Sequence, residues 1–411
     1  MYMTKLSSIA DYVTDKISSN DIALREYVTT DCILQNKKGR EIATNLPPQS
    51  CCLTRYQRSD VLIANIRPYL KKVWFADIDG GASSDVLVFR AKEGHSPSFL
   101  YAVLLQDSFF DYVMQGAKGS KMPRGDKEQI LRYEMPTLSC SEESIGTFFL
   151  NLDQKIRLNE QINQNLEAMA KQLYDYWFVQ FDFPNENGKP YKSSGGKMVW
   201  NEKLKREIPK GWNVLKLGEH CSFNKRTSNG YFNHPILYLD TSNITNNTID
   251  ELQFLNPSSD IIPSRARRLV QEGDIVYSTV RPNLKHFGII MNPDYNMVVS
   301  TGFAVITANW SAYRYFIYQF LIQAATIENL STIAQSAVSA YPSINTSDIE
   351  NLDLVVPPDS MIEKYAKTAC RLYLQIDTNY KEIKSLTKQR DELLPLLMNG
   401  QVSVNSDLSD D

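Results

Sequence analysis

The 411-residue sequence has few cysteines and no long hydrophobic run. Its six cysteines show no CxxC spacing, and Cys51 and Cys52 are adjacent, so neither a zinc site nor a disulfide framework is indicated. No apolar run reaches the roughly 18 residues that a membrane span needs, and the opening MYMTKLSS lacks the apolar region of a signal peptide. These absences predict a cytoplasmic protein that does not contact a membrane.

Catalytic and cofactor motifs are also missing. The sequence has no GxxxxGK[ST] loop for a nucleotide triphosphate, no GxGxxG after a strand, and no histidine or cysteine cluster with metal spacing. Asn292-Pro293-Asp294-Tyr295 resembles the Asn/Asp-Pro-Pro-Phe/Tyr motif of amino-methyltransferases, but Asp replaces the second Pro and no glycine-rich loop lies upstream, so we interpret it as a turn. We therefore expect a non-enzyme with no catalytic residues, metal or cofactor of its own.

A strong excess of positive charge is missing as well. The formal net charge is −3 with 22% charged residues, which is ordinary for a globular protein. Any contact with nucleic acid must therefore come from local basic clusters rather than from an overall positive field.

Two long stretches have the composition and period of paired helices. In roughly residues 144–178 and 361–399, apolar residues recur every three or four positions, with Asn159 and Arg390 at one polar turn each. A narrow stripe on so long a helix is typical of a coiled coil. The predicted seam consists of Leu152, Ile156, Ile162, Leu166, Met169 and Leu173 in the first helix and Leu372, Ile376, Tyr380, Ile383, Leu386, Leu393 and Leu397 in the second.

The first half of the sequence recurs in the second half. DVLIANIRPYLKK matches DIVYSTVRPNLKH, which aligns Asp60 with Asp274 and Arg67 with Arg281. The loop GAKGSKMPRGDK then corresponds to AQSAVSAYPSIN, and a long helix follows both. A period of very roughly 210–225 residues exceeds that of solenoid repeats, so a globular unit has been duplicated.

This organisation predicts an α+β fold in which two similar mixed α/β domains are joined by two long helices. We expect the helices to form an antiparallel coiled coil with pseudo-twofold symmetry. The expected segments are a first domain at 1–143, a helix at 144–180, a linker at 181–207, a second domain at 208–358, a second helix at 359–400 and an acidic tail at 401–411.

Basic residues cluster at matching places in the two halves. Guanidinium and ammonium groups on loops suit phosphate oxygens, and arginine also recognises guanine. Each basic residue taken alone could be a solvated surface residue, and Arg67 and Arg281 could instead cap a strand before the proline. The candidate DNA-binding residues are Arg67, Lys71, Lys72, Lys118, Lys121, Arg124, Arg265, Arg267, Arg268, Arg281 and Lys285.

An aromatic run, YDYWFVQFDF, ends the first long helix. It could form a platform on which bases stack, but we favour packing at the helix end.

The whole chain, to about residue 404, resembles the specificity (S) subunits of type I restriction–modification systems. The resemblance rests on the architecture and on segments similar to that family's conserved regions: LNLDQKIRLNEQINQNLEAMAKQLYDYWF, FDFP…GKPYKSSGGKM…EIPKGW, INTSDIENLDLVVPP and KQRDELLPLLMNGQV. The segments before the long helices depart from the family, which often has Glu-Gln followed by Ile there.

The resemblance implies a subunit that reads double-stranded DNA and performs no chemistry. Each domain would read one half of a bipartite target, and the helices would set the gap and bind two methyltransferase (modification) subunits. Restriction/translocase subunits would join this complex. S-adenosylmethionine, ATP and Mg would then lie on the partner subunits. The alternative is a coiled-coil adaptor between proteins that does not read DNA, but this would leave the duplicated basic loops unexplained.

Overall fold

The described part of the chain divides into two units. The computed structural model describes residues 3–119, 121–137, 141–336 and 342–404. Unit 1 consists of the residues up to Ile162 together with those from Asn379 onward, and unit 2 consists of Asn163–Thr378. Each long helix therefore contributes one stretch to each unit.

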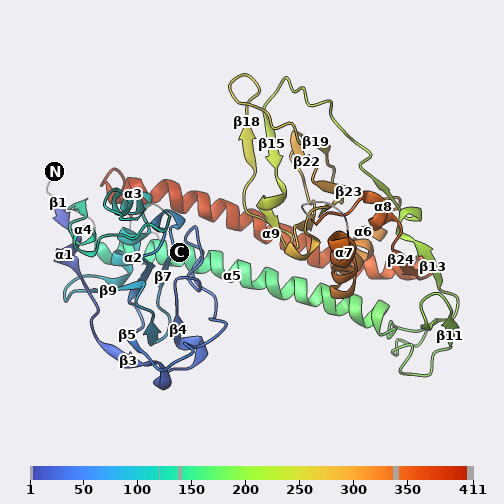
Figure 1. Ribbon diagram of the computed structural model, residues 1–411, viewed down its shortest axis with the longest axis horizontal. Coiled ribbons are helices and arrows are strands. Elements are labelled where there is room, and N and C mark those ends of the chain that lie inside the picture. Colours follow the sequence, from blue (N-terminus) through green and yellow to red (C-terminus); the bar gives the residue numbers. More distant parts are fainter. Residues whose placement is uncertain (1–2, 120, 138–140, 337–341, 405–411) are drawn as a thin grey trace, which may run out of the picture. The chain divides into compact units, whose positions relative to one another are not determined.

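Two four-stranded sheets form the centre of unit 1 (Figure 1). The antiparallel first sheet has the order β2 (Ala10–Tyr12), β9 (Val86–Ala91), β6 (Val61–Ala64) and β7 (Val73–Phe75). The second has the order β3 (Lys16–Ser18), β5 (Cys52–Tyr56), β8 (Gly80–Ala82) and β4 (Tyr27–Val28), with β4 and β8 parallel. A separate pair joins β1 (Met3–Lys5) to β10 (Glu134–Pro136).

Unit 2 repeats this arrangement. Its first sheet has the order β14 (Cys221–Phe223), β23 (Phe303–Ala308), β20 (Ile275–Ser278) and β21 (Phe287–Ile289). Its second has the order β18 (Gln253–Leu255), β15 (Ile236–Leu239), β22 (Met297–Ser300) and β19 (Ala266–Leu269), with β15 and β22 parallel. The smaller pairs are β13 (Asn213–Lys216) with β24 (Asp353–Val356), β16 (Ile244–Thr245) with β17 (Thr248–Ile249), and β11 (Met198–Asn201) with β12 (Arg206–Pro209).

The two units share a frame and differ at an edge. Their first sheets have the same order, and β4-β8-β5 corresponds to β15-β22-β19 in the second. Unit 1 adds β3 beside β5, whereas unit 2 adds β18 beside β15. The duplication inferred from the sequence is confirmed, and the strands unique to each unit lie at opposite edges of the shared three.

Strand β6 shows why the first sheet is buried on both faces. Successive side chains of a strand point to opposite faces. Val61 and Ile63 join the hydrophobic core that includes the helices, while Leu62 joins a separate core with Trp74. A continuous apolar run, rather than an alternating one, therefore marks this strand in the sequence.

The aligned aspartates Asp60 and Asp274 are buried at equivalent turns before β6 and β20. Each carboxylate accepts a hydrogen bond from the backbone amide three residues earlier. Arg90 on β9 donates two hydrogen bonds to Asp60, whereas Asp274 is held by Arg226 and the hydroxyl of Thr307. A buried carboxylate needs such partners, so each unit keeps an arginine but supplies it from a different place.

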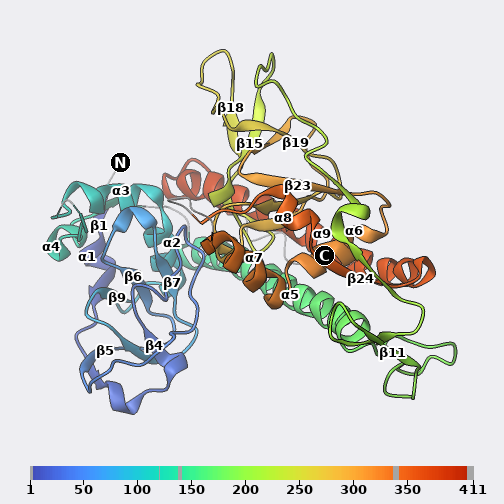
Figure 2. The same cartoon turned by 45° about the vertical axis from the view of Figure 1, so that its right-hand side comes forward.

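Short helices pack on the first sheets and against one another (Figure 2). They are α1 (Leu6–Ile9), α2 (Pro97–Leu105), α3 (Asp107–Gln115) and α4 (Lys127–Ile130) in unit 1, and α6 (Tyr313–Leu321), α7 (Ala324–Ser336) and α8 (Thr346–Glu350) in unit 2. The sequence predicted one helical stretch where α2 and α3 lie. The extended backbone of Gln106 separates them.

The long helices are α5 (Glu142–Tyr174) and α9 (Asp359–Met398). A π-helical turn, Asp175–Val179, continues α5. In unit 1, Asn159 donates a hydrogen bond to Glu382 (2.8 Å), and Arg390 lies 3.4 Å from Asp153. In unit 2 the side-chain amide of Asn163 donates a hydrogen bond to the backbone carbonyl of Ile376 (3.3 Å). A second contact in unit 2 joins the rings of Tyr174 and Tyr365. The order of these contacts makes the helices antiparallel within each unit, as predicted.

The predicted seam is partly wrong. Ile156, Ile376, Leu386 and Leu397 are buried, and Leu152, Leu166, Leu173, Leu372, Tyr380, Ile383 and Leu393 are half-buried. Ile162 and Met169, however, are 37% and 53% exposed. The buried stripe instead includes the polar residues Asp153, Asn159 and Asn163. Counting only apolar residues missed these positions because their polar groups are satisfied by hydrogen bonds across the helix pair.

The aromatic run after α5 packs into unit 2, as favoured from the sequence. Trp177 and Phe178 are buried, and Phe178 contacts Trp212 and Phe316. Residues 181–207, expected to be a linker, contain strand β11 and the first residues of β12. The start of this segment is held by contacts of the Phe181 and Phe183 rings with Trp212, about 30 residues later in the sequence. The composition of the segment alone does not indicate such contacts.

None of the helices in the described ranges is both long and apolar enough to span a membrane.

Burial makes Glu167 on α5 a pH-sensitive position. Burial raises the pKa of the Glu167 carboxyl group to about 7. A hydrogen bond that the side chain of Asn247 donates to this carboxyl group (3.4 Å) acts in the opposite direction but is the smaller effect. Below about pH 4.5 the group is protonated in both the folded and unfolded states. Between that value and pH 7 the unfolded state ionises first, so the free energy of unfolding should fall as pH rises.

We expect Glu167→Gln to remove this fall and to raise the free energy of unfolding above pH 7 by roughly 1–3 kcal/mol. Urea unfolding at a series of pH values measures the effect. Glu363→Gln, at an exposed position of α9, controls for the loss of a charge. Parallel stability curves for the wild type and Glu167→Gln would contradict the assignment.

Candidate nucleic-acid interface

The RP turn of unit 1 has an uncommon backbone. It comprises the 3₁₀-helix η3 (Pro68–Leu70) between Arg67 (φ 54°, ψ 62°) and Lys71 (φ 51°, ψ 48°), both left-handed. Non-glycine residues rarely adopt this region, and each instance costs on the order of 1–2 kcal/mol. Such strain is characteristic of functional sites, where the surrounding structure maintains it.

The RP turn of unit 2 has the same geometry. Arg281 (φ 49°, ψ 68°) and Lys285 (φ 57°, ψ 36°) flank η7 (Pro282–Leu284). The amide of Arg67 donates to the carbonyl of Pro123 (2.8 Å), and that of Arg281 to the carbonyl of Pro342 (2.9 Å). Both turns are therefore held in the same way by the loop that precedes α4 in unit 1 and α8 in unit 2.

The arginine side chains of the RP turns point outward. Arg67 and Arg281 are exposed, and neither caps its 3₁₀-helix through its side chain. A cleft of about 300 Å³ lies beside Arg281 and is also lined by Asn283, Ser331 and Gln335. The two guanidinium groups therefore lie at equivalent places on the surfaces of the two units.

Two of the candidate lysines in unit 1 have structural partners. Lys71 lies 3.0 Å from Asp107, and Lys72 donates to the carbonyl of Thr30 (2.7 Å). Burial tends to raise the pKa of Asp107, but hydrogen bonds from Lys37 and Lys71 outweigh it and lower that pKa. These lysines stabilise the base of the turn.

The loop before α4 carries three more candidates. Lys118 pairs with Asp126 (2.9 Å) and Arg124 with Asp85 (3.2 Å), both at the surface. Lys121 is exposed and pairs with no acidic side chain among the described residues. In unit 2 the corresponding loop includes residues 337–341, which lie outside the described residues.

The arginines around β19 differ in availability. Arg265 is exposed. Arg267 donates to the carbonyls of Ser264 (3.0 Å) and Asn229 (2.6 Å), which fixes it against the neighbouring loop. Burial lowers the pKa of Arg268, whose Nε has no hydrogen-bond partner among the described residues. Exposed Lys285 and Arg265 are therefore better placed for phosphate than Arg267 or Arg268.

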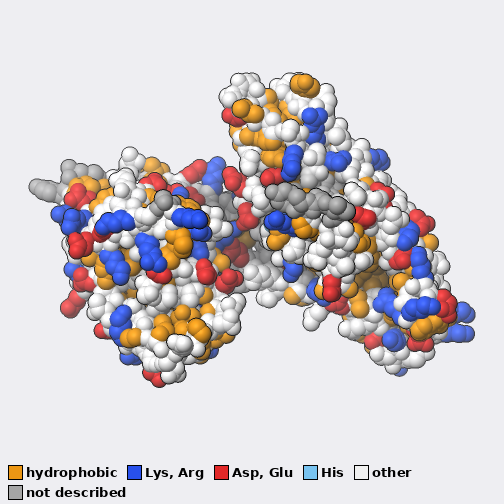
Figure 3. Space-filling model, in the orientation of Figure 1, with side chains coloured by type: hydrophobic (Ala, Val, Ile, Leu, Met, Phe, Trp, Pro, Cys, Tyr) orange, Lys and Arg blue, Asp and Glu red, His pale blue; other side chains and the backbone are white. Residues whose placement is uncertain are grey.

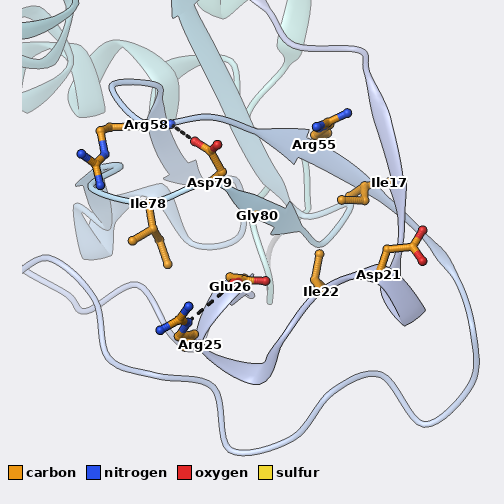
Figure 4. A pocket seen from close by; sticks show the side chains of 10 residues that line it. All are labelled: Ile17, Asp21, Ile22, Arg25, Glu26, Arg55, Arg58, Ile78, Asp79 and Gly80. Carbon is orange, nitrogen blue, oxygen red and sulfur yellow. Dashed lines mark hydrogen bonds and ion pairs between the residues drawn. The ribbon is translucent and has the colours of Figure 1, made fainter.

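Sequence analysis missed a groove of about 520 Å³ in unit 1 (Figure 4). Its lining includes Arg25 from the turn before β4, Arg55 from β5 and Arg58 from the turn that follows. The carboxylates of Glu26 and Asp79 lie among them. The spacing of the two arginines around the end of β5 was the available signal, but single basic residues are too common to identify a site.

Three exposed apolar side chains on loops of unit 2 were also missed. Tyr231, Ile261 and Tyr295 are between 86% and 94% exposed. Each follows or lies among Asn, Asp, Gly, Ser or Pro residues, as in NGYFN and NPDYN. The turn residues around them were the available signal, although the neighbouring Phe232 and Ile262 pack against a core. Tyr295 lies in the segment interpreted as a turn, and the amide of Met297 closes that turn on the carbonyl of Asp294 (2.9 Å).

Residues 209–388 match the family model described as the type I restriction modification DNA specificity domain. This match includes the second RP turn and the loops around it. Over these residues the chain matches this family, and the relatives described next extend the similarity to the rest of the chain.

Curated relatives support the assignment. The specificity subunit of the type I restriction enzyme MjaIX from Methanocaldococcus jannaschii is 25% identical over 402 residues, which cover 94% of this chain and 86% of the relative. The HindI specificity subunit from Haemophilus influenzae is 28% identical over 171 residues, covering 41% of this chain and 36% of the relative. The S subunit of a type I restriction–modification system from M. genitalium has a similar fold, with a TM-score of 0.57, 14% identity and coverage of 97% and 96%.

For a specificity subunit with phosphate contacts at both RP turns, Arg67→Ala and Arg281→Ala should weaken binding to target and non-target duplexes alike. Each substitution should reduce the slope of log K against log salt by about 0.9, because one phosphate contact is lost. Fluorescence anisotropy between 50 and 300 mM salt would measure it. Arg132→Ala, which removes a surface ion pair between a residue just after α4 and Glu128 on α4, is the matched control. A lower melting temperature with an unchanged slope would contradict the prediction.

Proposed function

We propose that this specificity subunit reads a bipartite DNA target, with unit 1 reading one half and unit 2 the other. The observation that carries the proposal is the recurrence of one frame with different edges. Both units present an RP turn with the same backbone conformation, yet their fourth strands and surrounding loops differ. Phosphate contacts give the same position on any duplex, whereas base contacts need unlike side chains.

The partners follow from the same repeat. We place one methyltransferase (modification) subunit on each repeat, and restriction/translocase subunits outside that core. S-adenosylmethionine would lie on the modification subunits, and ATP and Mg on the translocase subunits, because this sequence has no phosphate-binding loop. The partners would also supply phosphate-binding surface, which fits a chain with a net charge of −3.

The adaptor alternative makes a different prediction for DNA. An adaptor without DNA reading would assemble with its partners but would not make their DNA binding sequence-specific. Mobility shifts of a target duplex with the chain alone, and then with a methyltransferase subunit added, distinguish the two functions.

Independent reading is tested by exchanging unit 2. The piece from Asn163 to Thr378 should be replaced with the equivalent piece of another specificity subunit. These ends leave the hydrogen bond between Asn159 and Glu382 in place and exchange both partners of the hydrogen bond between Asn163 and Ile376 together. We expect one half of the methylated sequence to change and the other to stay. Mapping methylated sites would measure this, and a change in both halves would contradict independence.

The helix pair is proposed to set the unread gap. Inserting four residues after Gln164 lengthens α5 by about 6 Å and nearly preserves the direction of its buried stripe. We expect the gap to widen by about one or two base pairs while both half-sites remain the same. Sequencing of methylated DNA gives the gap length directly.

A two-residue insertion at the same place is the control. It rotates the following helix by about 200° and would expose the buried stripe, so partner binding or solubility should be lost. An unchanged gap with full activity in the four-residue variant would show that the helices do not set the spacing.

A further inference from the structure

The segment that joins α5 to unit 2 is the most basic part of the chain. Residues 188–212, here called the basic hairpin, contain seven Lys or Arg and two Glu, a net charge of +5 in a chain whose net charge is −3. Figure 3 shows Lys and Arg side chains gathered over β11. A charge contrast of this size indicates an anionic partner rather than a neutral linker.

The basic hairpin is held in a fixed conformation. The ring of Phe183 is stacked between Tyr191 (4.6 Å between centroids) and Trp212 (5.1 Å). Strands β11 and β12 pair over four residues. Its cations therefore have a defined arrangement, unlike those of a flexible tail.

Two lysines face each other at the base of the hairpin. The amide of Lys210 donates to the carbonyl of Lys197 (2.9 Å), one step beyond the Met198–Pro209 pair. Like charges directly opposite on paired strands are destabilising. Neither ammonium group pairs with an acid among the described residues, although Lys203 and Lys205 in the same hairpin pair with Asp353 and Glu202. An external anion would relieve this repulsion.

Open glycine turns border these lysines. Gly188, Gly195 and Gly211 have positive φ, and a Cβ on any of them would meet no atom within 4 Å. Lys189 and Lys210 are adjacent to two of these glycines. Bare backbone beside ammonium groups lets a bulky anion such as a phosphodiester approach closely.

Resting on the proposed function, we infer that the basic hairpin binds the phosphate backbone of the DNA independently of sequence. A duplex is favoured over an acidic protein because, among the described residues, a hairpin of this kind follows the first long helix but not the second, after which residues 399–404 contain no Lys or Arg. A surface shared by identical modification subunits on both repeats would have to occur twice.

The test compares two double variants of the full chain in complex with modification subunits. Lys197→Gln/Lys210→Gln removes the facing pair, and Lys203→Gln/Lys205→Gln removes two already paired lysines from the same hairpin. For the first variant we expect a salt slope smaller by about 1.8, the same loss of affinity for target and non-target duplexes, and unchanged methylated sites. For the control we expect an unchanged slope.

Lys197→Glu adds a second signature. It places opposite charges on the facing positions, so the melting temperature of the free chain should rise while DNA binding weakens. An unchanged salt slope in the facing-pair variant would overturn the inference. Loss of assembly with modification subunits, in that variant or in a Trp200→Ala variant at an exposed position of β11, with DNA binding otherwise normal, would instead identify a protein-docking surface.

Failure of the proposed function would look different. In that case the unmodified complex would not distinguish the target duplex from a scrambled one, whatever the hairpin variants do.

Discussion

The structure depends on burying polar groups along two long helices. Neither α5 nor α9 could bury its stripe alone, and the buried stripe contains charged and amide groups as well as apolar ones. Asp153 and Arg390 lie about 3.4 Å apart in the core of unit 1, and the hydroxyl of Tyr101 and the guanidinium of Arg157 also contact that aspartate. A polar pair is satisfied in one register only, whereas apolar side chains tolerate several, so these contacts define how the helices align.

The sheets and loops of both units are attached to the same two helices. Gly146 lets α5 pass α2 closely, since a Cβ there would lie 2.3 Å from the amide nitrogen of Phe99. In unit 2, Gln319 donates to the hydroxyl of Tyr373 (2.8 Å) on α9. Each unit is therefore attached rigidly to its own stretch of the helices, and a change of loops at its edge need not disturb that attachment.

Within each unit, the elements that recur in both units are distinct from those that differ between them. The RP turn, the first sheet and the buried aspartate recur, while the fourth strand of the second sheet and the exposed loop residues do not. Substitutions in exposed loops change the folding stability of a protein little. Removing the arginine that pairs with a buried carboxylate lowers that stability strongly. The same fold can thus carry different sequence preferences, and in the function proposed above the RP turns would make the same phosphate contact in both units.

The sequence by itself determined the duplication, the two long helices, the paired RP turns and the family. These follow from local patterns: helical period, turn residues and repeated motifs. Tertiary structure alone decided that Ile162 and Met169 are exposed, that Arg267 and Arg268 are held within the unit, and that Lys197 faces Lys210. The reason is physical. Exposure, ion pairing and cross-strand proximity depend on partners distant in sequence, and composition within a segment carries no information about them.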